Sequence, residues 1–252
     1  MRPGARERRL RAALWLCCGA LAACGGDGPA APEPPGLRLL SSHRLEVAEP
    51  SGLSFGGASL WTVSGRNQRV YRLDLEGRVH RRLDYKGEDL EGIAYDPSDA
   101  SLWVVEEGER AVVHLNGDGR EIGRRELDLE GPANSGLEGV CLEDGVLHLL
   151  NEKDPPLYLA LGDGAIRVRR RVAFASDLAG LACGGGRFWL LSDRDRALYL
   201  WGPERGVEAT YPLDIDKAEG VALDPGAGRL YVVSESESRL YVYLVEDEAG
   251  GS

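Results

Sequence analysis

Five segments of this 252-residue chain resemble one another, and four of them carry acidic side chains at matching positions. In three segments a glutamate directly precedes the glycine of a short apolar run: Glu91, Glu138 and Glu219. Further along each segment, after a run such as LWVV, a second position is acidic in four copies: Glu107, Glu152, Asp193 and Glu235. Oxygen-only ligand sets suit Ca²⁺, which accepts about 6–8 oxygens in loose geometry, better than Mg²⁺, which prefers a strict octahedron. The pattern therefore indicates cation chemistry.

The two acidic positions are incomplete in two of the five segments. The first position holds Ser51 in the first segment and Ala179 in the fourth, and the second position holds Gly65 in the first segment. A third position, two residues beyond the second, is polar in every segment: Asn67, Glu109, Asp154, Asp195 and Glu237. We interpret this third set as solvated loop tips.

Nucleophilic catalysis has little support in the sequence. The chain contains no G-x-S-x-G, P-loop, H-E-x-x-H or C-x-x-C motif. Of its four histidines, His148 aligns with tryptophan and tyrosine in the other segments, which favours a packing role. His114 aligns with arginine, leucine and valine, and His43 and His80 fall in expected outer strands. A serine–histidine–aspartate triad would therefore lack its base.

The positions above belong to an internal repeat of about 41 residues. Its marker glycines are spaced by 40, 47, 41 and 40 residues: Gly52, Gly92, Gly139, Gly180 and Gly220. Each unit alternates apolar runs with turns rich in Asp, Gly and Pro, which predicts four short strands. Four-stranded antiparallel units at a fixed period are the blades of a β-propeller. We therefore predict an all-β fold, a five-bladed propeller with four antiparallel strands per blade.

The two ends of the repeat region predict how the ring closes. The fifth unit stops after its third strand, whereas residues 37–47 resemble an outer strand placed before the first unit. We expect residues 37–47 to pair with residues 239–245 and complete the last blade.

Ring closure would bring the two acidic positions to one face of the propeller, because the first strand starts where the second ends. Carboxylates a few ångström apart repel by a few kcal/mol per close pair at an effective dielectric near about 20. Either protons or a hard cation must offset this repulsion. For Glu91, Glu138 and Glu219, at the start of the strands that line the channel, we favour a metal ion.

The amino-terminal segment is typical of an exported protein. Residues 1–23 combine a basic stretch with about twelve apolar residues, too few to span a bilayer. The sequence LAAC at 21–24 resembles a lipobox, so we predict a lipoprotein signal at 1–23 and a lipid anchor on Cys24. An ordinary cleaved signal is the alternative. Residues 24–36 form a Gly/Pro-rich tether, residues 37–247 the propeller and residues 248–252 a disordered tail.

The net charge of the chain excludes one class of partner. Removing residues 1–23, which carry +4, takes the formal net charge from −11 to −15 and argues against nucleic-acid binding.

Cys141 and Cys183 fall at unequal offsets in their repeats, so we expect their side chains on opposite faces of their strands. A disulfide is an alternative, but we predict two buried apolar side chains.

The elements DLEGIAYDP, WVVEE, GLEGVCL, LLNEKD, LLSDRD, EGVALDP and VVSES resemble the SdiA-regulated family of bacterial proteins over about residues 38–246. This resemblance implies a five-bladed propeller, distantly similar to NHL-repeat proteins, that binds calcium on the ring. It assigns the metal to Glu91, Glu138, Glu219, Glu107, Glu152, Asp193 and Glu235. Gly65 and Ala179 depart from the family pattern, so the first and fourth blades are expected to contribute less.

Two function classes follow. The first is a monomeric, calcium-binding lipoprotein that acts as a binding or scaffolding module for an envelope protein or small molecule. Because Gly25 follows the lipobox cysteine, we place it in the bacterial cell envelope, at the periplasmic face of the outer membrane. The second is a calcium-dependent hydrolase, such as an esterase, lactonase or phytase-like enzyme, with its metal at the channel mouth.

Overall fold

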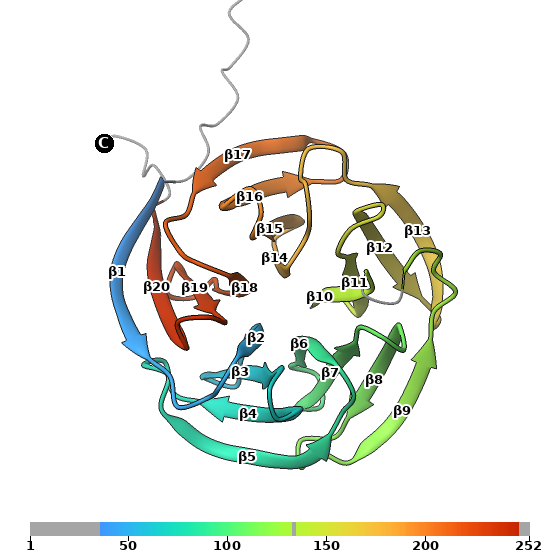
Figure 1. Ribbon diagram of the computed structural model, residues 1–252, viewed down its shortest axis with the longest axis horizontal. Helices are drawn as coiled ribbons and strands as arrows, with labels where there is room; N and C mark the ends of the chain where they lie inside the picture. The colour runs from blue at the N-terminus through green and yellow to red at the C-terminus, as the bar shows by residue number, and fades with distance from the viewer. Residues whose placement is uncertain (1–35, 133–134, 247–252) are drawn as a thin grey trace, which may run out of the picture. The chain divides into compact units, whose positions relative to one another are not determined.

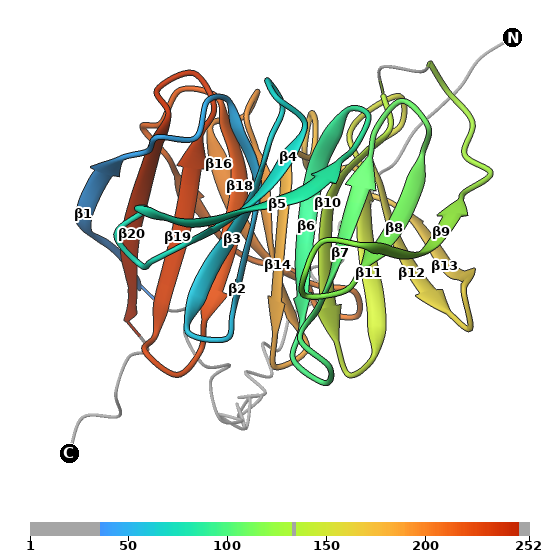
Figure 2. The ribbon, with the colours of Figure 1, turned by 90° about the horizontal axis from the view of Figure 1, so that it is seen from below.

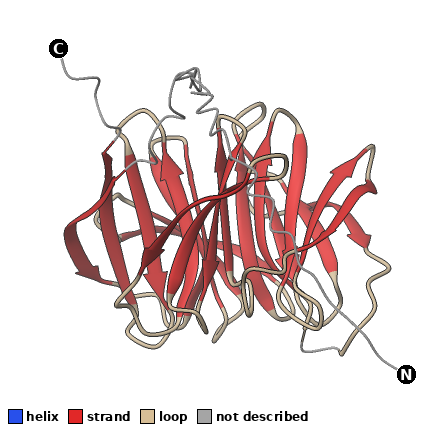
Figure 3. Ribbon diagram, turned by 90° about the horizontal axis from the view of Figure 1, so that it is seen from above, coloured by secondary structure: helices blue, strands red, loops and turns tan. Residues whose placement is uncertain are grey.

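Twenty β-strands in five separate four-stranded antiparallel sheets make up the computed structural model over the residues it describes, 36–132 and 135–246. The five sheets surround a central axis as the blades of a propeller (Figure 1), and the described residues contain no helix (Figure 3). The predicted fold class is confirmed. The expectations for residues 1–23, Cys24, residues 25–35 and residues 248–252 lie outside the described residues, whereas Gly36 begins the first strand.

In each blade the strand nearest the axis comes first in the chain and the outermost strand last, except in the blade that closes the ring. The first blade consists of β2 (Pro50–Gly56), β3 (Ser59–Ser64), β4 (Arg69–Leu73) and β5 (Val79–Lys86). The second consists of β6 (Leu90–Asp96), β7 (Ser101–Glu106), β8 (Ala111–Leu115) and β9 (Glu121–Glu126). The third consists of β10 (Leu137–Glu143), β11 (Val146–Asn151), β12 (Leu157–Gly162) and β13 (Ala165–Arg171). The fourth consists of β14 (Gly180–Gly184), β15 (Arg187–Ser192), β16 (Ala197–Gly202) and β17 (Gly206–Pro212).

The fifth blade joins the two ends of the described chain. It consists of β18 (Ala218–Asp224), β19 (Arg229–Ser234), β20 (Arg239–Glu246) and, as its outer strand, β1 (Gly36–Arg44). β1 runs antiparallel to β20 with Leu39 opposite Tyr243, and the two strands lie side by side in Figures 1 and 2. The predicted closure of the ring is confirmed. Beyond β1, Leu45 and Val47 are buried at 4% and 1% exposure, which anchors the start of the described residues to the core.

The marker glycines of the repeat allow the innermost strands to approach one another closely. A Cβ atom on Gly92 would lie 2.4 Å from the Glu138 carbonyl oxygen, and one on Gly220 would lie 2.3 Å from the Ser51 carbonyl oxygen. Contacts this short exclude any side chain. The glycines therefore set the narrow spacing of the strands around the axis, and with it the spacing of the acidic residues that precede them.

Aromatic side chains fill several junctions between blades. Trp61 of the first blade stacks on Tyr95 of the second with 6.0 Å between ring centroids, and Phe55 stacks on Tyr231 at 6.5 Å. His148 packs edge-on against Phe188 and shares a 2.7 Å hydrogen bond between its Nδ1 and the Tyr158 hydroxyl. Its predicted packing role is therefore confirmed.

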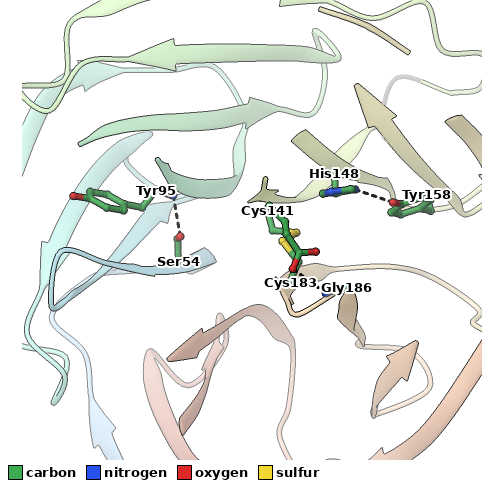
Figure 4. The surroundings of a disulfide bond; sticks show 8 residues. Ser54, Tyr95, Cys141, His148, Tyr158, Cys183 and Gly186 are labelled. Carbon is green, nitrogen blue, oxygen red and sulfur yellow. Dashed lines mark hydrogen bonds between the residues drawn. A yellow bond between two sulfur atoms is a disulfide. The ribbon is translucent and has the colours of Figure 1, made fainter. Parts of the chain in front are cut away.

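The prediction that Cys141 and Cys183 are separate apolar side chains is wrong, because they form a disulfide with their Cα atoms 6.0 Å apart (Figure 4). The two residues lie on β10 and β14, the innermost strands of neighbouring blades. Strands side by side around a ring turn opposite faces toward each other. The unequal offsets that place the cysteines on opposite faces of their own strands are thus what brings the two sulfur atoms together.

Candidate metal centre

All seven acidic residues predicted to bind metal line one cavity of about 420 Å³ at one end of the ring. Glu91, Glu138 and Glu219 lie near the starts of the innermost strands β6, β10 and β18. The other four follow the ends of the second strands β7, β11, β15 and β19: Glu107, Glu152, Asp193 and Glu235. Ser51, Gly65 and Ala179, the departures from the pattern, line the same cavity. The predicted convergence on one face is correct.

Backbone hydrogen bonds hold the two acidic positions of a blade together. The Glu107 amide donates to the Asp89 carbonyl at 2.9 Å, and the Glu152 and Glu235 amides make the same bond with Gly136 and Lys217. Each acceptor lies two residues before the first acidic position. The sheet pairing of the first and second strands therefore fixes both carboxylates at the mouth of the ring.

The closest groups of carboxylates lie on the second and third blades. Ligand oxygens of Glu107, Glu138 and Glu152 all lie within 4.8 Å of one another, and the same holds for Asp89, Glu91 and Glu107. Glu107 is common to both groups. Glu219, Asp193 and Glu235 line the cavity but belong to neither group. At this mouth of the ring, the carboxylates that could hold a cation are therefore closest together on one side, at the second and third blades.

Asp89 was missed by sequence reasoning. It belongs to a column two residues before the first acidic position, which reads Glu49, Asp89, Gly136, Asp177 and Lys217. Glu49, Asp89 and Lys217 have φ angles of 48°, 58° and 45°, in the left-handed region that favours glycine. Because this column mixes acids with a lysine and a glycine, it does not stand out as a repeated acidic position. Four of its five members are nevertheless charged and line or adjoin the cavity.

Cations balance the acids at the rim. Lys217 Nζ lies 2.5 Å from a Glu235 carboxylate oxygen and 4.0 Å from one of Glu219, and Lys153 pairs with Glu152. On the fourth blade, Arg194 lies 3.8 Å from buried Asp177. Glu91 and Glu138, deeper in the mouth, make no ion pair with a described residue.

Glu138 is the most deeply placed carboxylate of the set. Its exposed fraction is 9%, and it makes no side-chain hydrogen bond with any described residue. Burial, followed by the nearby charges of Glu91 and Glu219, raises its pKa well above the ordinary value. A buried carboxylate without a partner is costly unless it is neutralised, so this position requires a proton or a cation.

The other channel glutamates share this electrostatic environment. Burial is the main cause that raises the pKa of Glu91 to about 7 and that of Glu219 to about 8, with the Glu91 charge next in importance for Glu219. Burial also raises the pKa of Glu107, whose carboxylate accepts a 3.1 Å hydrogen bond from the Gly136 amide. Glu91 and Glu219 therefore keep part of their protons near neutral pH when no cation is bound.

The third polar set lies outside this cavity, as predicted. Several of its members accept hydrogen bonds from a tyrosine four residues later: Tyr199 donates to Asp195 at 2.9 Å, and Tyr241 donates to Glu237 at 2.6 Å. Glu109 is exposed. These side chains stabilise the turns rather than the mouth.

The residues of the mouth fit Ca²⁺ in their chemistry. Every candidate ligand is a carboxylate oxygen, and neither histidine nor cysteine is among the described residues that line the cavity. Either group of three carboxylates, Glu107 with Glu138 and Glu152 or Glu107 with Asp89 and Glu91, would hold the ion, and water or a ligand would supply further oxygens. Bound Ca²⁺ would supply positive charge that offsets the repulsion among these groups.

Comparisons with known proteins agree with the fold. The family model described as SdiA-regulated matches residues 45–243, and no curated protein matches the sequence. Among solved structures, a glutaminyl cyclase from Myxococcus xanthus has a TM-score of 0.70 at 18% identity, covering 86% of this chain and 99% of its own. A gluconolactonase from Xanthomonas campestris has a TM-score of 0.54 at 16% identity, covering 86% and 98%. These low identities establish a shared fold alone.

Proposed function

The chain belongs to the SdiA-regulated family, and from its acidic mouth we propose that it is a calcium-binding β-propeller of the bacterial cell envelope. In this proposal a lipid on Cys24 tethers it to the membrane, and the propeller acts as a binding or scaffolding module. The cation stabilises the mouth and gives that face a fixed positive centre within an acidic surface.

Glu138 carries the proposal. It is a buried carboxylate that lines the cavity, lies near two further carboxylates and has no partner among the described residues. A Ca²⁺ ion in contact with Glu107, Glu138 and Glu152 would neutralise this group and repay the cost of its burial. Protonation is the competing way to neutralise it, and the experiment below separates the two.

The charged rim of the cavity supports a binding role. Lys153 and Lys217 lie beside the carboxylates, so the rim offers both signs of charge around a cavity of about 420 Å³. A Ca²⁺ ion with unfilled coordination positions accepts oxygen ligands from outside the chain. Carboxylate groups of a partner protein or small molecule are the chemistry that this rim suits.

The Cys141–Cys183 disulfide supports the proposed location. Disulfides form and persist in oxidising compartments such as the bacterial periplasm and are rare in the cytosol. The bridge is thus an observation in favour of export that is independent of the lipobox at residues 21–24. The outer-membrane location rests on the amino-terminal sequence alone.

A calcium-dependent hydrolase is the second candidate. Two proteins of similar fold are described as a glutaminyl cyclase and a gluconolactonase, and Ca²⁺ at the mouth could polarise a substrate oxygen. Glu91, with its pKa near about 7, is the available general base, because no histidine lies among the described lining residues. Release of acid from simple lactones and esters, lost in Glu91→Gln, would favour this candidate over a binding module.

Thermal melting with Ca²⁺, with Mg²⁺ and with chelator tests the proposal. Calcium at about 100 times its Kd stabilises a folded protein by about 2.7 kcal/mol, which raises the melting temperature of a domain of this size by about 5–10 °C. Glu138→Gln keeps the shape of the side chain but loses its charge, and should lose most of the shift. Glu109→Gln, on the exposed third set, should keep it. Equal melting of the parent protein with Ca²⁺ and with chelator would overturn the proposal in favour of protonation.

A further inference from the structure

A second cavity, of about 340 Å³, lies between the second and third blades. Asp96 and Leu142, at the ends of the innermost strands β6 and β10, line it together with His114 near the end of β8. The acidic mouth lies at the starts of the same innermost strands, so the two cavities are at opposite ends of the ring. We call the second cavity the interblade cleft.

The cleft exists because Leu142 occupies a position that holds an aromatic ring in two other blades. The last residue of the apolar run is Phe55, Tyr95, Leu142, Cys183 or Leu223 in successive blades. Tyr95 fills its junction by stacking on Trp61 and Phe55 by stacking on Tyr231. Leu142 is smaller and leaves space in front of Trp103. The other leucine, Leu223, also borders a cavity, of about 200 Å³.

The walls of the cleft provide a flat aromatic surface and an apolar pocket. The rings of Trp103 and His114 are parallel, with centroids 3.8 Å apart, and His114 is held by a 2.7 Å hydrogen bond between its Nε2 and the Ser101 hydroxyl. Val112, Leu147 and Leu161 are buried beside them. Apolar walls with a few polar groups are typical of small-molecule sites of this size.

The charged groups of the cleft leave one cation free. Asp163 pairs with Arg167 at 3.1 Å, and Asp96 accepts hydrogen bonds from the amide and hydroxyl of Ser98. Arg124 is occupied by Glu106, Glu121 and the Tyr85 hydroxyl. The backbone of Arg125 pairs with Val112 in the sheet, whereas its side chain makes no ion pair or hydrogen bond with any described residue.

The position of Arg125 depends on a glycine of the facing blade. A Cβ atom on Gly164 would lie 2.7 to 3.0 Å from the Arg125 guanidinium group, so that group lies against the bare backbone of Gly164. Gly164 has a φ of +72°, and both residues line the cleft. Arg125 therefore reaches across from the second blade to the third, at the edge of the apolar pocket.

We propose that the interblade cleft binds a small molecule with a flat aromatic body and one carboxylate. The body lies in the space that Tyr95 and Phe55 fill at other junctions, against Trp103 and the leucines, and the carboxylate pairs with Arg125. A planar guanidinium group recognises a carboxylate through two parallel hydrogen bonds. This site is independent of the acidic mouth.

Calorimetric titration of the full chain with 2-naphthoate, and with the neutral 2-naphthamide, tests the proposal. The naphthoate should bind at least about tenfold more tightly than the amide, because hydrogen bonds between charged groups are stronger than those to a neutral group. Arg125→Ala, at an exposed position, should remove this preference. Leu142→Phe should abolish binding of both compounds, because it places at this junction a ring like the one that Phe55 provides between the first and fifth blades.

Leu223→Phe is the matched control, since it fills the smaller cavity and should leave the affinity for naphthoate unchanged. Chelator and Glu138→Gln should also leave it unchanged, which separates this site from the calcium proposal. Melting temperatures of the variants report whether they fold, and Arg125→Ala serves alone if Leu142→Phe does not. Absence of naphthoate binding at millimolar concentration, or equal affinity in the parent and Arg125→Ala proteins, would overturn the proposal.

Discussion

The Ser51 hydroxyl donates a 2.6 Å hydrogen bond to Glu91 Oε2, joining the first acidic position of the second blade to its uncharged counterpart in the first. The serine thus takes part in the mouth by orienting a neighbouring carboxylate, although it offers no charge. One oxygen of Glu91 is held in place by this bond. The missing carboxylate at position 51 makes the mouth asymmetric, with its closest acids on the second and third blades.

The metal-free protein should lose stability as pH rises from about 5 to about 8. Glu91 and Glu219 have folded-state pKa values of about 7 and about 8, above their ordinary value of 4.5. Between these limits the folded state holds protons that the unfolded state has released, so raising the pH favours unfolding. Denaturant melts in chelator across this range measure the slope. Saturating Ca²⁺ should flatten it, and a stability that rose with pH in chelator would contradict the account.

Glu138→Gln should stabilise the metal-free protein at about pH 8 by about 1–2 kcal/mol, because it removes one of several like charges from a buried site. Chemical denaturation in chelator measures the change. Glu109 is exposed and lies two residues after Glu107, which lines the mouth. Glu109→Gln should therefore change the free energy of unfolding by less than about 0.5 kcal/mol. Destabilisation by Glu138→Gln would mean that its carboxylate is already satisfied without a cation.

Reduction of the Cys141–Cys183 bridge should destabilise the propeller by about 4 kcal/mol, the chain-entropy expectation for a loop closed over 42 residues. Melting of the parent protein with and without reductant measures the loss. In the double variant Cys141→Ala/Cys183→Ala the reductant should have no effect. If reductant left the parent protein's melting temperature unchanged, the disulfide would contribute nothing to stability.

Deletion of residues 37–47 should destabilise the whole ring. The deletion removes most of β1, which pairs with β20 along its length, and the buried residues Leu45 and Val47. Loss of a complete outer strand exposes the edge of β20. Circular dichroism melts should show a much lower melting temperature, whereas deletion of residues 25–35 should have little effect. A ring that melted unchanged without residues 37–47 would contradict closure by β1.

The fold could be predicted because the same pattern of strands and turns recurs in five copies along the sequence. Glycines such as Gly92 and Gly220 mark where neighbouring strands meet. An outer strand before the first unit, together with a last unit that lacks its own outer strand, indicates closure of the ring. Likewise, a carboxylate that recurs at one strand end must converge with its copies once the ring closes. All seven predicted residues therefore reach one cavity.

The features that were missed depend on relations between blades rather than within the repeat. Cys141 and Cys183 meet because neighbouring strands present opposite faces to each other, which an alignment of copies does not display. Asp89 joins the carboxylate group through a turn with positive φ, in a column of mixed charge. The interblade cleft depends on the size of Leu142 relative to Tyr95, which matters only when the facing blade is in place.

Anomalous X-ray diffraction from crystals grown with Ca²⁺ shows whether the mouth of the ring holds a cation. We expect a difference peak at the mouth of the ring, at about 2.3–2.6 Å from carboxylate oxygens of Glu107 and Glu138. The peak should be lost in crystals of Glu138→Gln. If crystals at saturating Ca²⁺ showed Glu138 buried in the mouth but no peak beside it, the calcium proposal would be wrong. Protonation would then be the means by which this buried carboxylate is neutralised.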